Sequence, residues 1–200
     1  MPNWTYNTIT IEGNKETLDM LMNDAVRNED GKLQLSSWFP IPETFLKYDT
    51  TNHPNGEGLR VGERLWPGLY ELNTPDRPII TEELIEEYKR ATQEQKEKYG
   101  AVGWYDYNCK YFGCKWDCEV EIEERTDEQV VLRTDTPWTA PEMFLLRLSL
   151  RYPDLYIRDN ADYEDGQWEI MEWQNGEGEL VDKGEYTFPE DEEEELEIIR

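Results

Sequence analysis

The alternation of apolar and polar residues predicts that the chain opens with a strand and then a helix. Residues 4–12 are rich in β-branched and aromatic types and stop at Gly13, which is typical of a strand. Asn14 suits the N-cap of a helix that ends before Gly31. Four apolar residues fall on one face of this helix: Leu18, Leu21, Met22 and Ala25. Residues 33–39 then favour a short second strand, which ends at a Pro-Ile-Pro element.

The next segment predicts an irregular insertion followed by a surface helix. Residues 43–80 show no clear period and contain several Pro and Gly residues. Thr81 then caps a helix that ends before Gly100. Acidic residues open this helix and basic residues close it, as the helix dipole favours: Glu82, Glu83, Lys96 and Lys98. Its apolar face is thin, which predicts a surface position: Leu84, Ile85, Tyr88 and Tyr99.

The pattern in the second half of the chain predicts strands around one buried helix. Strict alternation predicts a half-buried strand with three glutamates on its polar side: Glu119, Glu121 and Glu123. A turn leads to a strand over 129–133. Thr139 and Glu142 match a capping box for an apolar helix over 143–152. Further strands are expected between turns at Asp159-Asn160, Asn175-Gly176 and Lys183-Gly184: 155–158, 167–173 and 185–188.

This order of elements predicts an α+β domain in which helices pack on one face of a mainly antiparallel sheet. A chain of 200 residues suits one domain with a sizeable core. We assign residues 1–189 to that domain, with the insertion at about 43–103, and residues 190–200 to an acidic C-terminal tail.

The composition indicates a folded chain with an unusually acidic surface. The 8 Trp, 12 Tyr and 5 Phe argue against disorder, because disordered segments are poor in aromatic residues. The net charge is −26, and residues 119–200 alone hold 26 acidic and 7 basic residues. Such a surface repels nucleic acid and membranes and attracts basic proteins. The chain shows no secretory signal and no apolar stretch of about 20 residues, and its three Cys are an odd number, so we expect a cytoplasmic protein.

Several motifs follow one another over residues 1–160 in an order that resembles a known family. They are Met1-Pro2-Asn3-Trp4, Asn7, Ile11-Glu12-Gly13, Pro40-Ile41-Pro42, Trp104-Tyr105-Asp106-Tyr107, Gly113-Cys114-Lys115-Trp116-Asp117, Thr136-Pro137-Trp138, Pro141 and Tyr152-Pro153. The pattern resembles the YubB ferredoxin-like family of phage and plasmid proteins, although Cys114 stands where Thr is expected and the acidic stretch from Asp159 is longer.

The resemblance implies a ferredoxin-like topology and an origin in a mobile element. It brings no catalytic residues, and "ferredoxin-like" names a topology rather than an iron–sulfur cluster. The motif residues are expected to serve the fold: Trp4, Trp104, Tyr105, Gly113, Lys115, Trp116 and Trp138.

No familiar catalytic or metal-binding motif is present. Cys109, Cys114 and Cys118 lack a fourth ligand that their spacing would motivate, which favours buried thiols over a metal site. His53 is the single histidine and lies in a loop sequence without an evident catalytic partner. The aromatic residues between Trp104 and Trp116 alternate with two lysines and suit base stacking, but core packing suits them better in so acidic a chain. We therefore expect no cofactor, no metal and no catalysis.

The acidity is the remaining functional signal. A net charge of about 2–8 suffices to keep a small domain soluble. We predict a non-enzymatic phage or mobile-element protein that inhibits a basic, nucleic-acid-binding host defence protein, such as a CRISPR effector, by mimicking DNA. The expected contact residues are Glu119, Glu121, Glu123, Asp159, Asp162, Glu164, Asp165, Glu169, Glu172, Glu190, Asp191, Glu192 and Glu193.

Other interpretations of the acidity remain open. One is a binding module whose charge serves solubility alone, and a halophilic origin would also account for the charge. Another is a carboxylate-based hydrolase, which requires a cleft holding a carboxylate with a strongly raised pKa.

Overall fold

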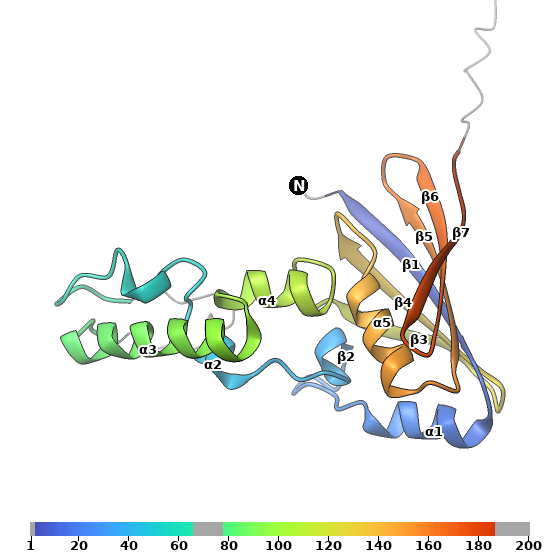
Figure 1. Ribbon diagram of the computed structural model, residues 1–200, viewed down its shortest axis with the longest axis horizontal. Helices are drawn as coiled ribbons and strands as arrows, with labels where there is room; N and C mark the ends of the chain where they lie inside the picture. Colours follow the sequence, from blue (N-terminus) through green and yellow to red (C-terminus); the bar gives the residue numbers. More distant parts are fainter. Residues whose placement is uncertain (1–2, 66–77, 187–200) are drawn as a thin grey trace, which may run out of the picture.

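A seven-stranded antiparallel sheet forms the body of the molecule (Figure 1). The computed structural model describes residues 3–65 and 78–186. The strands follow the order β2-β3-β4-β1-β5-β6-β7 across the sheet. Their bounds are β1 Trp4–Glu12, β2 Leu33–Gln34, β3 Glu119–Arg125, β4 Gln129–Pro137, β5 Tyr156–Tyr163, β6 Gln167–Gln174 and β7 Glu177–Glu185. The fold is therefore α+β with an antiparallel sheet, as the sequence predicts. The acidic tail, with Glu190, Asp191, Glu192 and Glu193, lies outside the described residues.

Two helices cover one side of the sheet and enclose the main core. They are α1, Lys15–Asp24, and α5, Glu142–Arg151 (Figure 1). Alternate residues of the central strands point toward them, and this core is fully buried: Ile9, Ile11, Leu18, Leu21, Leu132, Phe144, Leu145, Leu148 and Ile157. No described helix covers the opposite side. We call that side the open face.

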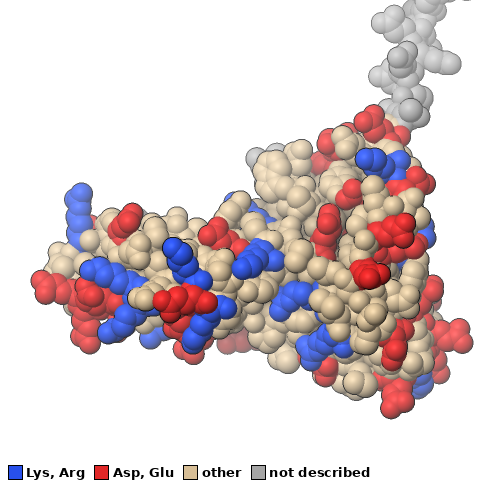
Figure 2. All heavy atoms as spheres, viewed as in Figure 1, with Lys and Arg blue, Asp and Glu red and all other residues tan. Residues whose placement is uncertain are grey.

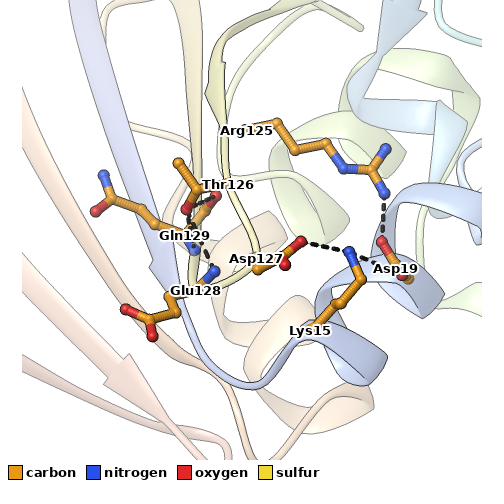
Figure 3. Close-up of polar contacts among 7 residues, drawn as sticks. All are labelled: Lys15, Asp19, Arg125, Thr126, Asp127, Glu128 and Gln129. Atoms are coloured by element: carbon orange, nitrogen blue, oxygen red, sulfur yellow. Dashed lines mark hydrogen bonds and ion pairs between the residues drawn. The ribbon is translucent and has the colours of Figure 1, made fainter.

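Ionic contacts fasten the start of α1 to the turn between β3 and β4 (Figure 3). Asn14 caps the helix as predicted, because its side chain accepts a hydrogen bond from the backbone N–H of Thr17. Lys15 pairs with Asp127, and Arg125 lies 2.6 Å from the Asp19 carboxylate. These pairs are solvent-exposed, so screening by water leaves each of them only a small effect on stability.

An arm projects from the sheet and consists of α2 Glu43–Lys47, a 3-10 turn at Pro54–Gly56, α3 Glu82–Tyr99 and α4 Gly103–Tyr111 (Figure 1). Thr81 caps α3 and Gly100 ends it with a left-handed φ of 60°, which confirms both predicted helix ends. The arm has a small core of its own, formed by Leu65, Ile80 and Tyr88. The prediction that residues 43–80 are irregular throughout is wrong, because α2 and the 3-10 turn lie within them.

Four further local predictions are wrong, each because another contact prevails. Only Leu33–Gln34 is a strand within 33–39, since the side chains of Gln34 and Ser37 cap a 3-10 helix there. Thr139 forms no capping box with Glu142, because its hydroxyl donates to the Gly113 carbonyl over 2.7 Å. The expected turns at 159–160 and 183–184 lie inside β5 and β7, where pairing with neighbouring strands holds the backbone extended.

Candidate acidic interface

The register of the sheet arranges the open face in rows that cross the strands. One row alternates carboxylates with aromatic rings: Asp135 of β4, Tyr6 of β1, Asp162 of β5 and Trp168 of β6. A second row contains Glu121, Arg133, Thr8, Asn160, Ile170 and Asp182. A third contains Glu124, Val131, Thr10, Arg158, Glu172 and Glu179. Because alternate residues of a strand share a face, these side chains belong to one surface.

The two arginines of these rows are already neutralised by neighbouring carboxylates. Arg158 lies 2.7 Å from Glu172, and Arg133 lies 3.4 Å from Glu123. Within residues 3–65 and 78–186, Glu121, Glu124 and Asp135 form no ion pair. The rows therefore present uncompensated negative charge. Figure 2 shows the side of the molecule on which α5 lies, where both signs mix along the arm and Asp and Glu predominate over the body at the right.

The expected ladder of three glutamates in β3 is interrupted by a β-bulge. The register shifts between Ile122 and Glu124, so the regular two-residue spacing is lost at Glu123. Glu121 lies opposite Arg133 in the sheet, whereas Glu119 forms an ion pair with Lys32 over 2.7 Å. The prediction of a regular charge ladder is thus wrong, although all three glutamates belong to β3.

Asp159 is buried, which contradicts its predicted place in the acidic surface. It is 1% exposed and lies opposite Ile9, on the side that the helices cover. Burial, reinforced by the carboxylates of Glu169, Glu142 and Asp162, raises the pKa of Asp159 well above its ordinary value. The pairing of Glu169 with Ala161 places it on the same covered side. The sequence predicts a surface position for both acids, because it does not reveal how the strands pair.

The remaining predicted acids lie at or near the surface. Glu164 and Asp165 are exposed next to the turn between β5 and β6, where the Glu164 carboxylate accepts the Trp4 backbone N–H over 2.9 Å. Asp162 is half-buried and accepts a hydrogen bond from the Tyr186 hydroxyl over 2.5 Å. Glu172 is half-buried and holds Arg158.

A hollow with a volume of about 510 Å³ lies at the β3–β4–β1 end of the open face. Its walls include the indole rings of Trp4 and Trp116, whose centroids are 5.7 Å apart at an interplanar angle of 49°. Four carboxylates contribute to its lining: Asp117, Glu119, Glu121 and Asp135. Burial raises the pKa of Asp117, and its Oδ1 atom accepts the Ser36 backbone N–H over 2.8 Å. The hollow thus combines aromatic surface with negative charge.

A larger hollow of about 880 Å³ lies near the start of β7. Its lining is also acidic and includes Asp154, Glu172, Glu177 and Glu179. Glu172 is occupied by its ion pair with Arg158. The two aromatic residues of this lining are Tyr156 and Trp173, and the latter is almost fully buried.

The motif residues mostly hold elements in place. Gly113 has a φ of 85° and packs against the first residues of α5. Trp104 is buried, and Lys115 lies over the Trp116 ring at 5.1 Å from its centroid. Tyr105 and Trp138 are instead exposed, at 43% and 55%.

Cys114 and Cys118 share one hydrogen-bond acceptor, whereas Cys109 and His53 belong to the arm. Cys114 and Cys118 are buried, and both thiols donate to the Trp116 carbonyl. Cys109 is exposed on α4. No group of three His, Cys, Asp or Glu in the part of the chain that the structure describes is placed to hold a metal ion. His53 lies in the arm, where its Nδ1 atom contacts the Glu57 carbonyl oxygen over 3.0 Å.

Sequence reasoning missed three of the four residues in the row that alternates charge and aromatic rings. Asp135, Tyr6 and Trp168 were not singled out as contact residues, because their proximity depends on which strands pair. The alternation of side chains within each strand is visible in the sequence, but the order of the strands in the sheet is not.

Comparisons with known proteins assign no family to this chain. No family model and no curated protein matches it. One crystal structure is similar, that of protein api92 from Yersinia pseudotuberculosis, which carries the family model DUF1281. The two chains are 11% identical, and the match covers 94% of this chain and 99% of that one, with a TM-score of 0.45. This likeness assigns neither fold nor function. No described helix is long and apolar enough to cross a membrane.

Proposed function

We propose that this protein is a non-enzymatic inhibitor from a phage or another mobile element, and that it binds a basic, nucleic-acid-handling host protein through its open face. A defence protein such as a CRISPR effector is the target class that we favour. The row of Asp135, Tyr6, Asp162 and Trp168 carries the proposal, because it sets carboxylates beside aromatic rings on the side that no described helix covers. Nucleic acid itself would be repelled by the same charge.

The mode of action that we propose is occupation of the target's phosphate-binding residues. Neighbouring strands are about 4.8 Å apart, so Asp135 and Asp162, which lie in one row on either side of β1, belong to strands about 9.6 Å apart. A rigid sheet therefore holds the charges at fixed separations, so the target's Arg and Lys side chains meet a preorganised surface. The aromatic rings between the carboxylates add apolar contact of the kind that dominates interface energies.

We also propose that the scaffold is ferredoxin-like. The element order β1-α1-β3-β4-α5-β5, combined with the strand order β3-β4-β1-β5, supports this topology. On this proposal β2 is an addition at one edge of the sheet, and β6 and β7 extend the other. The arm is an insertion before β3. The open face would then consist of a four-stranded ferredoxin-like sheet that the β6–β7 hairpin widens.

Capture of the partner tests this function. The full-length protein is immobilised, incubated with lysate of its native host and eluted with salt, and the eluted proteins are identified by mass spectrometry. We expect a basic nucleic-acid-binding protein whose affinity falls at least 10-fold between 50 and 500 mM salt, because screening weakens exposed charge contacts. An affinity that is indifferent to salt contradicts charge mimicry.

A charge-matched pair of variants separates mimicry from solubility. Glu124→Gln with Asp162→Asn removes two charges from the open face, and Glu57→Gln with Glu97→Gln removes two from exposed sites on the arm. Weaker binding by the first pair alone supports the proposal. Equal binding by both pairs favours the alternative in which acidity serves solubility.

A carboxylate-based hydrolase is the other alternative, and one observation bears on it. Asp117 combines a raised pKa with a position in the lining of the Trp4–Trp116 hollow. Hydrolytic activity that is lost in Asp117→Asn would establish this alternative, provided that the variant unfolds at the same denaturant concentration as the parent protein.

A further inference from the structure

The hollow lined by Trp4 and Trp116 has the features of a receptor for a single cationic side chain. Its two indole rings are tilted by 49° and their centroids are 5.7 Å apart, so they pack against each other and form one continuous aromatic wall. Aromatic faces attract cations within about 6 Å of the ring centroid, and tryptophan does so best. Lys115 places its Nζ atom 5.1 Å from the Trp116 centroid but does not line the hollow, so this internal cation contact lies outside it.

Two carboxylates of the hollow are available to a guest. Glu119 is engaged with Lys32 over 2.7 Å, and Asp117 accepts the Ser36 backbone N–H. Glu121 and Asp135, by contrast, take part in no ion pair within the described chain, and both are exposed. They belong to adjacent strands, β3 and β4, at the rim of the hollow. A guest between them would meet two negative charges and two aromatic rings.

The protein's own arginine at this site is directed to another partner. Arg133 lines the hollow, and its guanidinium lies 3.4 Å from the Glu123 carboxylate. Glu123 is the residue at which the β3 register shifts, so the bulge supplies Arg133 with a partner of its own. This ion pair leaves Glu121 and Asp135 uncompensated, although Arg133 is directly opposite Glu121 in the sheet.

We infer that this hollow binds one arginine side chain of a basic protein partner, an inference that rests on the proposed function. The guanidinium is planar, stacks on aromatic rings and donates paired hydrogen bonds to carboxylates. A lysine ammonium is a compact and strongly hydrated charge, so it uses the aromatic wall less well. The volume of about 510 Å³ is within the range of about 300–1,000 Å³ that is usual for ligand pockets.

Binding of a small probe tests this site without any protein partner. The probe is N-acetyl-arginine amide, and its neutral counterpart is N-acetyl-citrulline amide, which has almost the same shape. The indole N–H signals of the full-length protein are followed by NMR during each titration. We expect the arginine probe to shift the Trp4 and Trp116 signals saturably, with an affinity at least 10-fold higher than that of the citrulline probe. N-acetyl-lysine amide should bind several-fold more weakly than the arginine probe.

Variants locate the effect within the hollow. Glu121→Gln with Asp135→Asn should reduce the affinity for the arginine probe at least 5-fold, whereas Glu57→Gln with Glu97→Gln on the arm should leave it unchanged. Equal affinities in the two variants would overturn the inference, and so would equal binding of the lysine and arginine probes. Unmoved Trp4 and Trp116 signals would overturn it as well.

Failure of this inference can be distinguished from failure of the proposed function. If the protein captures a basic partner but the arginine probe leaves the two indole signals unmoved, the hollow is not the receptor and the proposed function stands. If the probe binds as expected but no basic partner is captured, the receptor stands and the proposed function fails.

Discussion

Asp159 lies directly opposite Ile9 in the pairing of β5 with β1, and both side chains are buried under the helices. The neighbours that continue this row are Leu132 on one side and Met171 on the other, so a carboxyl group is set among apolar residues. Neither of its oxygen atoms has a hydrogen-bond partner within the described residues. Burial is the main cause of its raised pKa, and the carboxyl group is therefore held in its neutral form far above the ordinary pKa of an aspartate.

This burial predicts a specific pH dependence of stability. The folded protein retains the Asp159 proton above pH 4, where the unfolded chain releases it, so the contribution is complete below the unfolded pKa of about 3.9. It is lost as the pH rises through the folded pKa. Asp159→Asn removes the ionisation, and we expect it to raise the free energy of unfolding at pH 8 by about 1–3 kcal/mol.

Urea denaturation of both proteins between pH 4.5 and pH 8 checks this prediction. The stability difference between Asp159→Asn and the parent should grow as the pH rises. Parallel curves would contradict a raised pKa. Partner binding near neutral pH should be unchanged, since the buried group is inaccessible to a partner.

Alanine substitutions at two glycines distinguish the cost of backbone strain from the cost of close packing. Gly113 and Gly31 have similar positive φ values, 85° and 76°. A Cβ atom at Gly113 would lie 3.0 Å from the backbone nitrogens of Glu142 and Met143, whereas one at Gly31 would meet nothing within 4 Å. Gly31→Ala should cost about 1 kcal/mol, the ordinary cost of a left-handed alanine. Gly113→Ala should cost at least 1 kcal/mol more.

Thermal and chemical denaturation of the two alanine variants give these values. Equal losses of stability would show that the start of α5 moves away from position 113 without cost. In that event Gly113 would be required for its backbone conformation alone.

Trp138 combines exposure with a strained backbone. It is 55% exposed and has a φ of 73°, which is rare for a bulky residue. Its backbone N–H donates to the Asn3 carbonyl over 2.8 Å, and this bond holds the end of β4 beside the start of β1. Trp138→Gly should therefore raise the free energy of unfolding by about 1 kcal/mol through relief of strain.

The same substitution should weaken capture of the partner, because exposed tryptophans are enriched among the residues that dominate binding energies. A denaturation curve checks the expected rise in stability, and affinity measurements at constant salt check the expected loss of binding. Higher stability with unchanged affinity would show that Trp138 lies outside the interface.

Gln95 links three helices of the arm. Its Oε1 atom accepts from the Thr50 hydroxyl over 2.6 Å and from the Gly103 N–H over 3.0 Å, and its Nε2 atom donates to the Thr44 carbonyl over 2.8 Å. Gln95→Met fills a similar volume but leaves these groups unpaired. We expect a local loss of about 2–4 kcal/mol, since each buried unsatisfied group costs about 1–3 kcal/mol.

Hydrogen exchange resolves where this loss occurs. The amides of α3 and α4 should exchange faster in Gln95→Met, while those of β1 and β4 keep their protection. Gln93→Met is the control, because Gln93 is exposed two residues earlier in α3 and its amide donates to the Glu97 carboxylate over 2.8 Å. Faster exchange throughout the sheet would mean that the arm and the body unfold together.

Local signals in the sequence predicted the elements whose ends are fixed by nearby residues. The bounds of β1 and the caps of α1 and α3 at Asn14 and Thr81 follow from residues within a few positions. The bulge at Glu123 and the burial of Asp159 depend on pairing between distant strands, so a pattern within one strand could not reveal them. For the same reason the sequence indicated an acidic surface but not the aromatic residues that the sheet places within it.

Acidic residues at an edge of the sheet also affect how the protein interacts with other copies of itself. β7 is an outer strand, and acidic residues recur along it: Glu177, Glu179, Asp182 and Glu185. An unpaired strand edge is a template for pairing with another chain, and self-association or fibril growth can begin there. Two copies that approach through this edge would bring like charges together. The acidic strand therefore discourages the sheet from extending into a second molecule, whether or not a host protein is present.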